Sequence, residues 1–291
     1  MILIDEFGES LTKSGASSST INSYLADLIL FESFCREKGL CETDKISSED
    51  ISRYFQYLCS LGRASSTIRR ARSSLNSYFI FLMKNNMSEN NPVKGIEMSK
   101  EKKGQTLPVL THAEIEKLLS FEYGTSEKGL RNKAMIELLY ATGIKISSLI
   151  AIKVSDYSPE YKMILAEGRR IPLYSSANDS LLSYLSYSRP FIASQIEDSL
   201  FVSLQGTSVS RQGLWKILRK IAEDAGIQKK LTPQLMRRSF AIHLLENGAG
   251  PREVGKMLGL SDRASVMNYV KMMQGDSITE DYRRFHPRAK K

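Results

Sequence analysis

The residues of this chain that could do chemistry lie in its last fifth, in short segments with ordered spacing. The segments are Thr232–Phe240 (TPQLMRRSF), Met257–Asp262 (MLGLSD), Tyr269 and His286–Ala289 (HPRA). An arginine can bind an oxyanion as a planar fork, and a tyrosine hydroxyl can act as a nucleophile. Taken alone, Tyr269 is better explained as a half-buried aromatic on an amphipathic helix, and Arg237 as a surface or salt-bridge arginine. Only the spacing of the surrounding segments favours catalysis.

In order and spacing, these segments strongly resemble the C-terminal boxes of the tyrosine recombinases, the phage integrase family. The closing His-Pro-Arg-Ala resembles the Xer subfamily. The resemblance covers essentially the whole chain and includes Leu130–Gly143, which is similar to the approach to the family's first arginine. It implies a helical core-binding domain, a linker and a catalytic domain that together clamp duplex DNA.

The resemblance also implies a reaction. In the family, the oxygen of a tyrosine attacks a backbone phosphate, which gives a 3′-phosphotyrosine and a free 5′-hydroxyl without metal or nucleotide. Tyr269 stands at the nucleophile position and Arg237 at one of the arginine positions. No cofactor and no metal ion are therefore expected.

Several positions depart from the family pattern. Lys145 stands in place of the first arginine, and Ser148 in place of the acidic residue that follows it. Gln234 and Leu260 stand where the family usually has histidines, and Arg238 replaces another histidine. Lysine supplies charge without the bidentate geometry of arginine, and losing one preorganised donor typically costs about 10²–10³ in rate. We therefore expect weakened catalysis. The candidate catalytic residues are Tyr269, Arg237, Lys145 and Gln234.

A tight β-hairpin is predicted over residues 164–173, with Gly168 helping the turn. The family places a lysine in this turn, whereas here only Arg169 and Arg170 are nearby. We interpret these two as DNA-backbone contacts or solvated turn residues rather than as a replacement general acid. Lys145, just after Gly143, either binds phosphate or satisfies the carbonyls at a helix C-terminus.

The first hundred residues are predicted to be all-helical, with one helix from Ser19, one after the capping box of Ser47 and Asp50, and one from about Ser66. In the second half, apolar periodicity and caps predict helices at 111–119, 130–142, 177–187, 209–225, 233–247, 251–258, 262–270 and 277–285.

The chain is basic, with 41 Lys and Arg against 32 Asp and Glu and a net charge of +9. This is compatible with a polyanionic partner. The arginines around 69–72 could equally well form a solvated helix face, and the lysines around 102–103 could equally well belong to a soluble linker. The candidate DNA-binding residues are Arg69, Arg70, Arg72, Lys102, Lys103, Arg169, Arg170 and Arg238.

The predicted fold is mainly α. It comprises an N-terminal helical core-binding (SAM-like) bundle at 1–90, a basic linker at 91–108, and an α+β tyrosine-recombinase catalytic domain with a small antiparallel sheet at 109–291. By resemblance, the C-terminal tail from about residue 275 docks into a neighbouring protomer.

The sequence also excludes some classes of protein. No run of about 18 apolar residues could span a membrane, and the N-terminus lacks the features of a secretory signal. We therefore expect a cytoplasmic protein with no membrane partner. The cysteines show no CxxC pair, and the three histidines, His112, His243 and His286, are too dispersed along the chain to indicate a metal site. Trp215 and Tyr140 are expected in the core.

Two functions remain open. The first is a DNA-binding protein of site-specific recombination or integration with weakened catalysis. The second is an active, divergent recombinase that cleaves and rejoins DNA through Tyr269. The retained Tyr269 and Arg237 favour the second, while the replacements at 145, 234 and 260 favour the first. Under both, the partners are double-stranded DNA and other recombinase protomers.

Overall fold

The computed structural model describes residues 3–40, 45–96, 108–260 and 263–274. The chain forms two compact units, Met1–Lys103 and Gly104–Lys291, which we describe separately. The candidates Lys102 and Lys103, the predicted helix at 277–285 and the predicted exchange tail lie outside the described residues.

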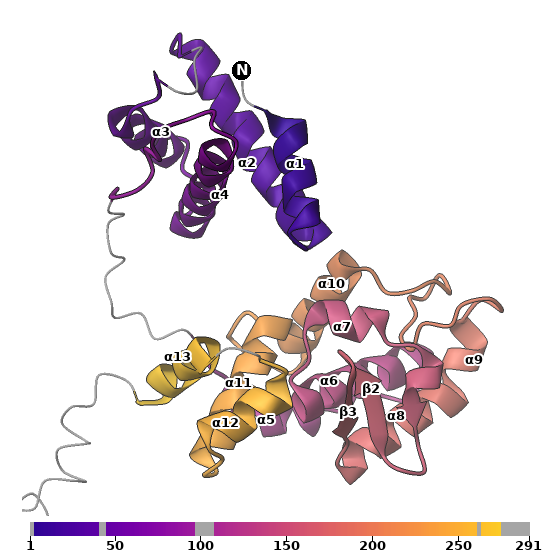
Figure 1. The fold of residues 1–291 in the computed structure, drawn as a ribbon. Coiled ribbons are helices and arrows are strands. Elements are labelled where there is room, and N and C mark those ends of the chain that lie inside the picture. Colours follow the sequence, from indigo (N-terminus) through magenta and orange to yellow (C-terminus); the bar gives the residue numbers. More distant parts are fainter. Residues whose placement is uncertain (1–2, 41–44, 97–107, 261–262, 275–291) are drawn as a thin grey trace, which may run out of the picture. The chain divides into compact units, whose positions relative to one another are not determined.

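The N-terminal unit is a bundle of helices, shown in indigo to purple in Figure 1. Its helices are α1 (Ile4–Lys13), α2 (Ser18–Glu37), α3 (Ser48–Ser60) and α4 (Ser65–Lys84). The predicted capping box is confirmed, because the Asp50 amide donates to Ser47 Oγ and the Ser47 amide donates to the Asp50 carboxylate. The short helix α1 was not among the predicted helices.

Aromatic side chains fill the core of this bundle. Tyr54, Tyr78 and Phe31 are at most 1% exposed. The ring of Phe7 on α1 meets Tyr78 on α4 edge to face, with centroids 5.4 Å apart. The hydroxyl of Tyr78 also accepts a hydrogen bond of 3.1 Å from the Leu3 amide. These contacts attach α1 to α4, whose outer side carries the predicted DNA-binding arginines.

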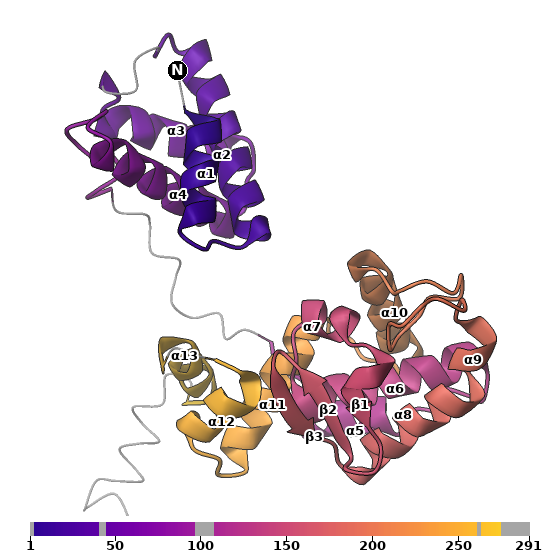
Figure 2. The same cartoon turned by 45° about the vertical axis from the view of Figure 1, so that its right-hand side comes forward.

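The C-terminal unit combines helices with a small sheet, as Figure 2 shows. Its helices are α5 (His112–Leu119), α6 (Glu127–Thr142), α7 (Ile146–Ala151), α8 (Ser175–Tyr187), α9 (Arg189–Ile192), α10 (Arg211–Asp224), α11 (Pro233–Glu246), α12 (Pro251–Leu258) and α13 (Arg263–Gln274), with a short 3₁₀ turn at Val154–Asp156. The strands β1 (Tyr157–Ser158), β2 (Met163–Ala166) and β3 (Arg169–Pro172) form an antiparallel sheet in that order. The mainly α fold with a small antiparallel sheet is therefore confirmed.

The predicted hairpin is the pair β2–β3, in which Ala166 pairs with Arg169 and Ile164 with Ile171. The two residues of its turn, Glu167 and Gly168, both have positive φ, at 53° and 70°. Such two-residue turns match the right-handed twist of the strands they join. The turn places Glu167 and Arg169 side by side at the end of the hairpin.

Helix α6 runs through the centre of this unit, and Met135, Ile136 and Leu139 on it are buried. It ends at Gly143, whose φ of 58° is the left-handed conformation that ends many helices. A Cβ at this position would lie 2.4 Å from the ring of Phe240 on α11. Gly143 is therefore required both by its backbone conformation and by the close approach of α11.

Of the two aromatic residues expected in the core, one is not there. Trp215 on α10 is 40% exposed, so its predicted place in the core is wrong. The α10 helix has an amphipathic pattern in which Leu214 and Leu218 are buried, and Trp215 follows Leu214 onto the outer side. Tyr140 is half-buried against the core. Among the described helices, none is both long enough and apolar enough to cross a membrane.

Candidate active site

Two arginines converge on the C-terminal turn of α12. The last carbonyls of a helix have no partner within the helix. Arg237, on α11, donates from Nη2 to the carbonyl oxygen of Leu258 at 2.8 Å and from Nη1 to that of Gly143 at 2.6 Å. Only 4% of Arg237 is exposed. Its guanidinium therefore joins the end of α6 to the end of α12.

Arg169, on β3, is the second arginine. Its Nη1 donates to the carbonyl oxygens of Met257 at 2.7 Å and Lys256 at 3.1 Å, and its Nη2 donates to Glu167 at 2.9 Å. A Cβ at Gly259 would lie 2.7 Å from the guanidinium, so Arg169 rests directly on the turn that ends α12. The interpretation of Arg169 as a solvated turn residue is wrong, because the hairpin lies against α12.

Glu167 joins this group from the hairpin turn. Its carboxylate accepts a hydrogen bond of 2.5 Å from Ser148 Oγ on α7, besides the one from Arg169. Burial raises the pKa of Glu167, but the hydrogen bonds from Ser148 and Arg169 and the charge of Lys145 outweigh it and hold the pKa below its ordinary value. Glu167 is therefore ionised at neutral pH.

Lys145 is the N-cap residue of α7, two residues after Gly143, and its side chain is exposed. The carbonyl oxygen of Gly143, at the C-terminal end of α6 near Lys145, accepts its hydrogen bond from Arg237. Gln234 is exposed on the first turn of α11, three residues before Arg237 and so on the same side of the helix. Arg170 is exposed on β3, on the face opposite the buried Ile171.

Tyr269 lies on α13 and is 9% exposed. It belongs to an apolar cluster with the buried Leu258 and Val254, and the half-buried Leu260 packs against the same cluster. Arg238 is near enough for its charge to interact with Tyr269, although burial is the larger influence and lowers the pKa of Arg238. The predicted nucleophile thus lies in a largely apolar setting with one nearby cation.

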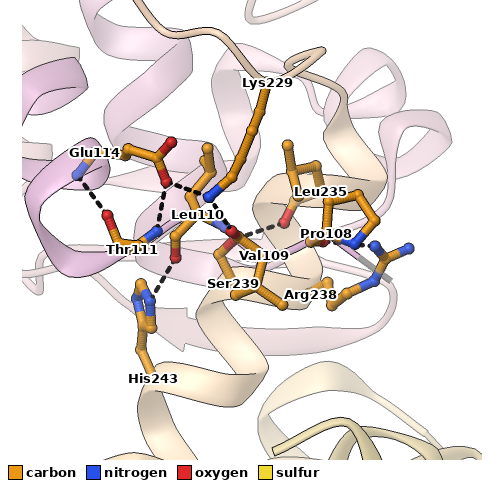
Figure 3. Close-up of polar contacts among 10 residues, drawn as sticks. All are labelled: Pro108, Val109, Leu110, Thr111, Glu114, Lys229, Leu235, Arg238, Ser239 and His243. Atoms are coloured by element: carbon orange, nitrogen blue, oxygen red, sulfur yellow. Dashed lines mark hydrogen bonds and ion pairs between the residues drawn. The ribbon is translucent and has the colours of Figure 1, made fainter. Parts of the chain in front are cut away.

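The segment Pro108–Thr111, which we call the exit strap, begins at the last residue of the predicted linker and lies along α11 (Figure 3). Arg238 Nη1 donates to the carbonyl oxygen of Pro108 at 2.7 Å. The Leu110 amide donates to Ser239 Oγ at 2.9 Å. Both α11 residues directly follow Arg237, so the strap is fixed beside it. Within the described residues, Arg238 thus contacts protein, and its predicted DNA contact stays a prediction.

Two further side chains hold the exit strap. Lys229 donates to the carbonyl oxygen of Val109 at 2.7 Å and to Glu114 at 2.6 Å. His243, on α11, bonds the carbonyl oxygen of Leu110 at 2.8 Å through Nε2 (Figure 3). A carbonyl only accepts, so Nε2 carries the proton and Nδ1 accepts the hydrogen bond from the Tyr140 hydroxyl.

Two of the histidines, His112 and His243, are closer together than their positions in the chain indicated. The rings of His112 and His243 stack with centroids 3.9 Å apart, and His112 Nε2 lies 3.1 Å from Glu246. The ligand atoms of His112, His243 and Glu246 lie within 4.8 Å of one another. However, both nitrogens of His243 are engaged by Leu110 and Tyr140, so this is a hydrogen-bonded stack rather than an open metal site.

In the N-terminal unit, the predicted arginines of α4 differ from one another. Arg70 binds the buried Asp27 with both ends of its fork, at 2.7 and 3.0 Å, and Ser74 donates to the same carboxylate at 2.7 Å. Arg69 is exposed, and Arg72 is half-buried. Arg70 therefore has a structural role in addition to any contact with DNA.

Sequence reasoning missed the basic outer side of α10. Exposed cations lie there at Arg211, Lys216, Arg219 and Lys220, of which the last two form ion pairs with Glu223 and Asp224. A hollow of about 610 Å³ beside this helix is lined by Trp215, Lys216, Arg219 and the loop 227–231. The signal was present in the sequence, because the cations follow the helical repeat while Leu214, Leu218 and Ile221 face inward.

Family profiles match most of the chain. The profile described as "Phage integrase family" matches residues 108–274, and the profile "Phage integrase, N-terminal SAM-like domain" matches residues 4–86. Tyrosine recombinase XerD of Oceanobacillus iheyensis is 37% identical over 94% of each chain, and XerD of Listeria innocua is 36% identical over 99% of each. The chain belongs to the phage integrase family of tyrosine recombinases. Within that family it is Xer-like.

Solved structures share the fold. A Tn1549 transposon integrase in complex with transposon right end DNA has a TM-score of 0.76 at 18% identity, covering 98% of this chain and 99% of that one. XerH site-specific recombinase bound to a palindromic difH substrate has a TM-score of 0.75 at 20% identity, covering 95% of this chain and 83% of that one. At such identities the likeness concerns the fold.

Proposed function

We propose that this chain is a DNA-binding protein of site-specific recombination whose strand cleavage through Tyr269 is weakened. The observation that carries the proposal is the state of the candidate active site around α12. The guanidinium of Arg237 is buried and donates to two backbone carbonyls. Leu260, which stands where the family usually has a histidine, packs against the apolar cluster that contains Tyr269.

The physical argument concerns the groups that remain for a phosphate. Lys145 offers an exposed point charge in place of a fork, and Gln234 offers an exposed amide. Leu260 can neither donate nor accept a hydrogen bond. Each lost donor or proton-transfer group costs about 10²–10⁴ in rate, and such losses do not multiply cleanly. Binding depends on summed charge and survives such losses better than catalysis does.

The alternative is an active, divergent recombinase that cleaves and rejoins DNA through a 3′-phosphotyrosine at Tyr269. One observation favours it. Arg238 replaces a histidine of the family pattern, and its charge reaches Tyr269. A guanidinium beside the tyrosine can hold an oxygen of the phosphate that is attacked.

The partners are double-stranded DNA and other recombinase protomers. The solved relatives described as DNA complexes support a DNA partner, and a λ integrase described as a dimer on a core site supports assembly on DNA. We assign backbone contacts to α4 in the N-terminal unit, residues 1–90, to the linker 91–108 with Lys102 and Lys103, and to Arg170. The tail from about residue 275 would join protomers, and the protein would act in the cytoplasm.

Covalent capture tests the proposal. The purified chain is incubated with nicked genomic fragments from its source, denatured with detergent, and the DNA that remains attached is sequenced. We expect strong retention of fragments before denaturation and sparse adducts afterwards, all absent from Tyr269→Phe. Abundant adducts focused on one site would establish the alternative. Failure to retain DNA before denaturation, even at low salt, would contradict both.

A further inference from the structure

We propose that Glu167 is the positioning carboxylate of the candidate active site: it holds Arg169 on the last turn of α12 and lies against α7 at Ser148, one helical turn after Lys145. The inference deepens the proposed function and rests on it, because it assumes that these cations face the DNA phosphate. It gives a role to Glu167, an acidic residue in the hairpin turn where the family has a basic lysine.

The first step concerns the place of the carboxylate. Glu167 comes from the hairpin turn, yet its Oε1 lies 2.5 Å from Ser148 Oγ on α7, 19 residues away along the chain. Ser148 occupies the position at which the family pattern has an acidic residue. A carboxylate is therefore present beside position 148, supplied by another element. The turn conformation with positive φ at Glu167 and Gly168 aims it there.

The second step concerns what the carboxylate holds. Glu167 Oε2 accepts from Arg169 Nη2 at 2.9 Å, while Nη1 of the same guanidinium donates to the carbonyls of Met257 and Lys256. The side chain of Glu167 is 17% exposed, and the side chain of Arg169 is 25% exposed. Hydrogen bonds to ionised groups in such partly buried settings are stronger than neutral ones. Glu167 thus orients the fork from one side and the helix end orients it from the other.

The third step links this pair to the remaining cations. Arg169 binds the carbonyl of Met257, and Arg237 binds the carbonyl of the next residue, Leu258. The guanidinium of Arg169 also keeps a buried Nε–H that has no hydrogen-bond partner among the described residues. Lys145 lies close enough to lower the pKa of Glu167. Glu167 therefore orders Arg169 directly and lies near Lys145, whereas Arg237 is held by backbone carbonyls at the same end of α12.

The fourth step asks whether the carboxylate can be supplied from α7 instead of from the hairpin turn. The contact between Ser148 and Glu167 borders a hollow of about 400 Å³, lined by Ser147, Ser148, Glu167 and Gly168 among others. The hollow has room for a longer side chain at position 148. In the double variant Ser148→Glu with Glu167→Gln, a carboxylate returns to nearly the same place from α7 instead of the hairpin.

The experiment compares the wild type, Glu167→Gln, the double variant and Glu160→Gln, an exposed charge removal in the loop between β1 and β2. Adduct formation on nicked DNA fragments is measured for each chain. Misplacing a reacting group by about 1 Å can cost 10²-fold, so we expect Glu167→Gln to lose about 10- to 100-fold. Glu160→Gln should match the wild type, and the double variant should recover most of the loss. A wild-type yield from Glu167→Gln, or no recovery in the double variant, would overturn the inference.

A second readout does not depend on cleavage. The side-chain Nε–H signals of ¹⁵N-arginine are recorded by NMR without DNA, with the Arg169 signal assigned by its loss in Arg169→Lys. We expect a protected Arg169 signal in the wild type and the double variant, and a rapidly exchanging one in Glu167→Gln. If the wild type forms no adducts, cleavage is excluded from the proposed function, and this signal alone decides the inference. An unchanged Arg169 signal in Glu167→Gln would then overturn it.

Discussion

Arg237 Nη1 donates a hydrogen bond of 2.6 Å to the carbonyl oxygen of Gly143, across 94 residues of chain. The other arm of the same fork binds Leu258 on α12. The residue at the arginine position of the family pattern therefore also fastens three helices, α6, α11 and α12. The proposed phosphate binding and the local packing share one side chain, and substitutions there should affect both.

Replacing Arg237 by lysine should lower stability as well as function. One ammonium group cannot reach two carbonyls in the geometry of a fork, so a buried acceptor is left unsatisfied. We expect the free energy of unfolding of the C-terminal unit to fall by about 1–3 kcal/mol, measured by denaturant titration. Arg211→Lys, at an exposed arginine of α10, is the matched control and should change it little. Equal values for both variants would show that the two carbonyl contacts add nothing.

The arginines of α4 should separate into two classes. In Arg70→Ala, the buried Asp27 carboxylate loses both hydrogen bonds from Arg70 and keeps the one from Ser74. We expect the free energy of unfolding of the N-terminal unit to fall by about 1–3 kcal/mol. The lower end of that range applies, because Arg70 is partly exposed. Arg69→Ala should cost less stability than Arg70→Ala, because Arg69 is exposed, and it should weaken binding to a duplex of any sequence. The slope of log affinity against log salt should then fall by about 1. The reverse pattern would refute this division.

The exit strap should depend on one hydroxyl. Ser239→Ala removes the acceptor of the buried Leu110 amide, which costs about 1–3 kcal/mol when no other partner replaces it. Ser120 is a suitable control, since like Ser239 it bonds the carbonyl four residues back but is exposed. We expect Ser120→Ala to be nearly neutral in thermal unfolding. If both variants unfold alike, the strap contact is not a stabilising one.

His243 should make stability depend on pH. Burial, followed by the charge of His112, lowers the pKa of His243 below its ordinary value of 6.5. The unfolded chain therefore takes up a proton at higher pH than the folded one, and stability falls as pH drops below about 6.5. His243→Gln should lose less stability than the wild type over that interval, measured as Tm from pH 8 to 5. Parallel curves would show that His243 is not the group responsible.

Local features could be predicted from the sequence where short-range chemistry decides them. The capping box at Ser47, the end of the helix 130–142 just before Gly143 and the hairpin turn at Gly168 are all confirmed. Each depends on residues within four positions of one another. The order of the family boxes likewise predicted the class of protein.

Contacts between distant segments could not be predicted in this way. Arg169 reaches the carbonyl of Met257 across 88 residues, and Arg70 reaches Asp27 across 43. Nothing in the local sequence distinguishes Arg70 from Arg69, or shows that Arg169 faces α12 while Arg170 faces solvent. The stacking of His112 on His243 also arises only when the exit strap folds onto α11. The roles of the individual cations therefore required the structure.

The most direct test of the account compares the wild type with a variant that returns three positions to the family pattern, Lys145→Arg, Gln234→His and Leu260→His. Yields of covalent adduct on nicked DNA are measured for both, with Tyr269→Phe as the blank in each background. Because each returned group is worth about 10²-fold or more, the account predicts a yield at least 10²-fold higher in the variant at equal DNA binding. A wild-type yield equal to that of the variant would contradict weakened cleavage.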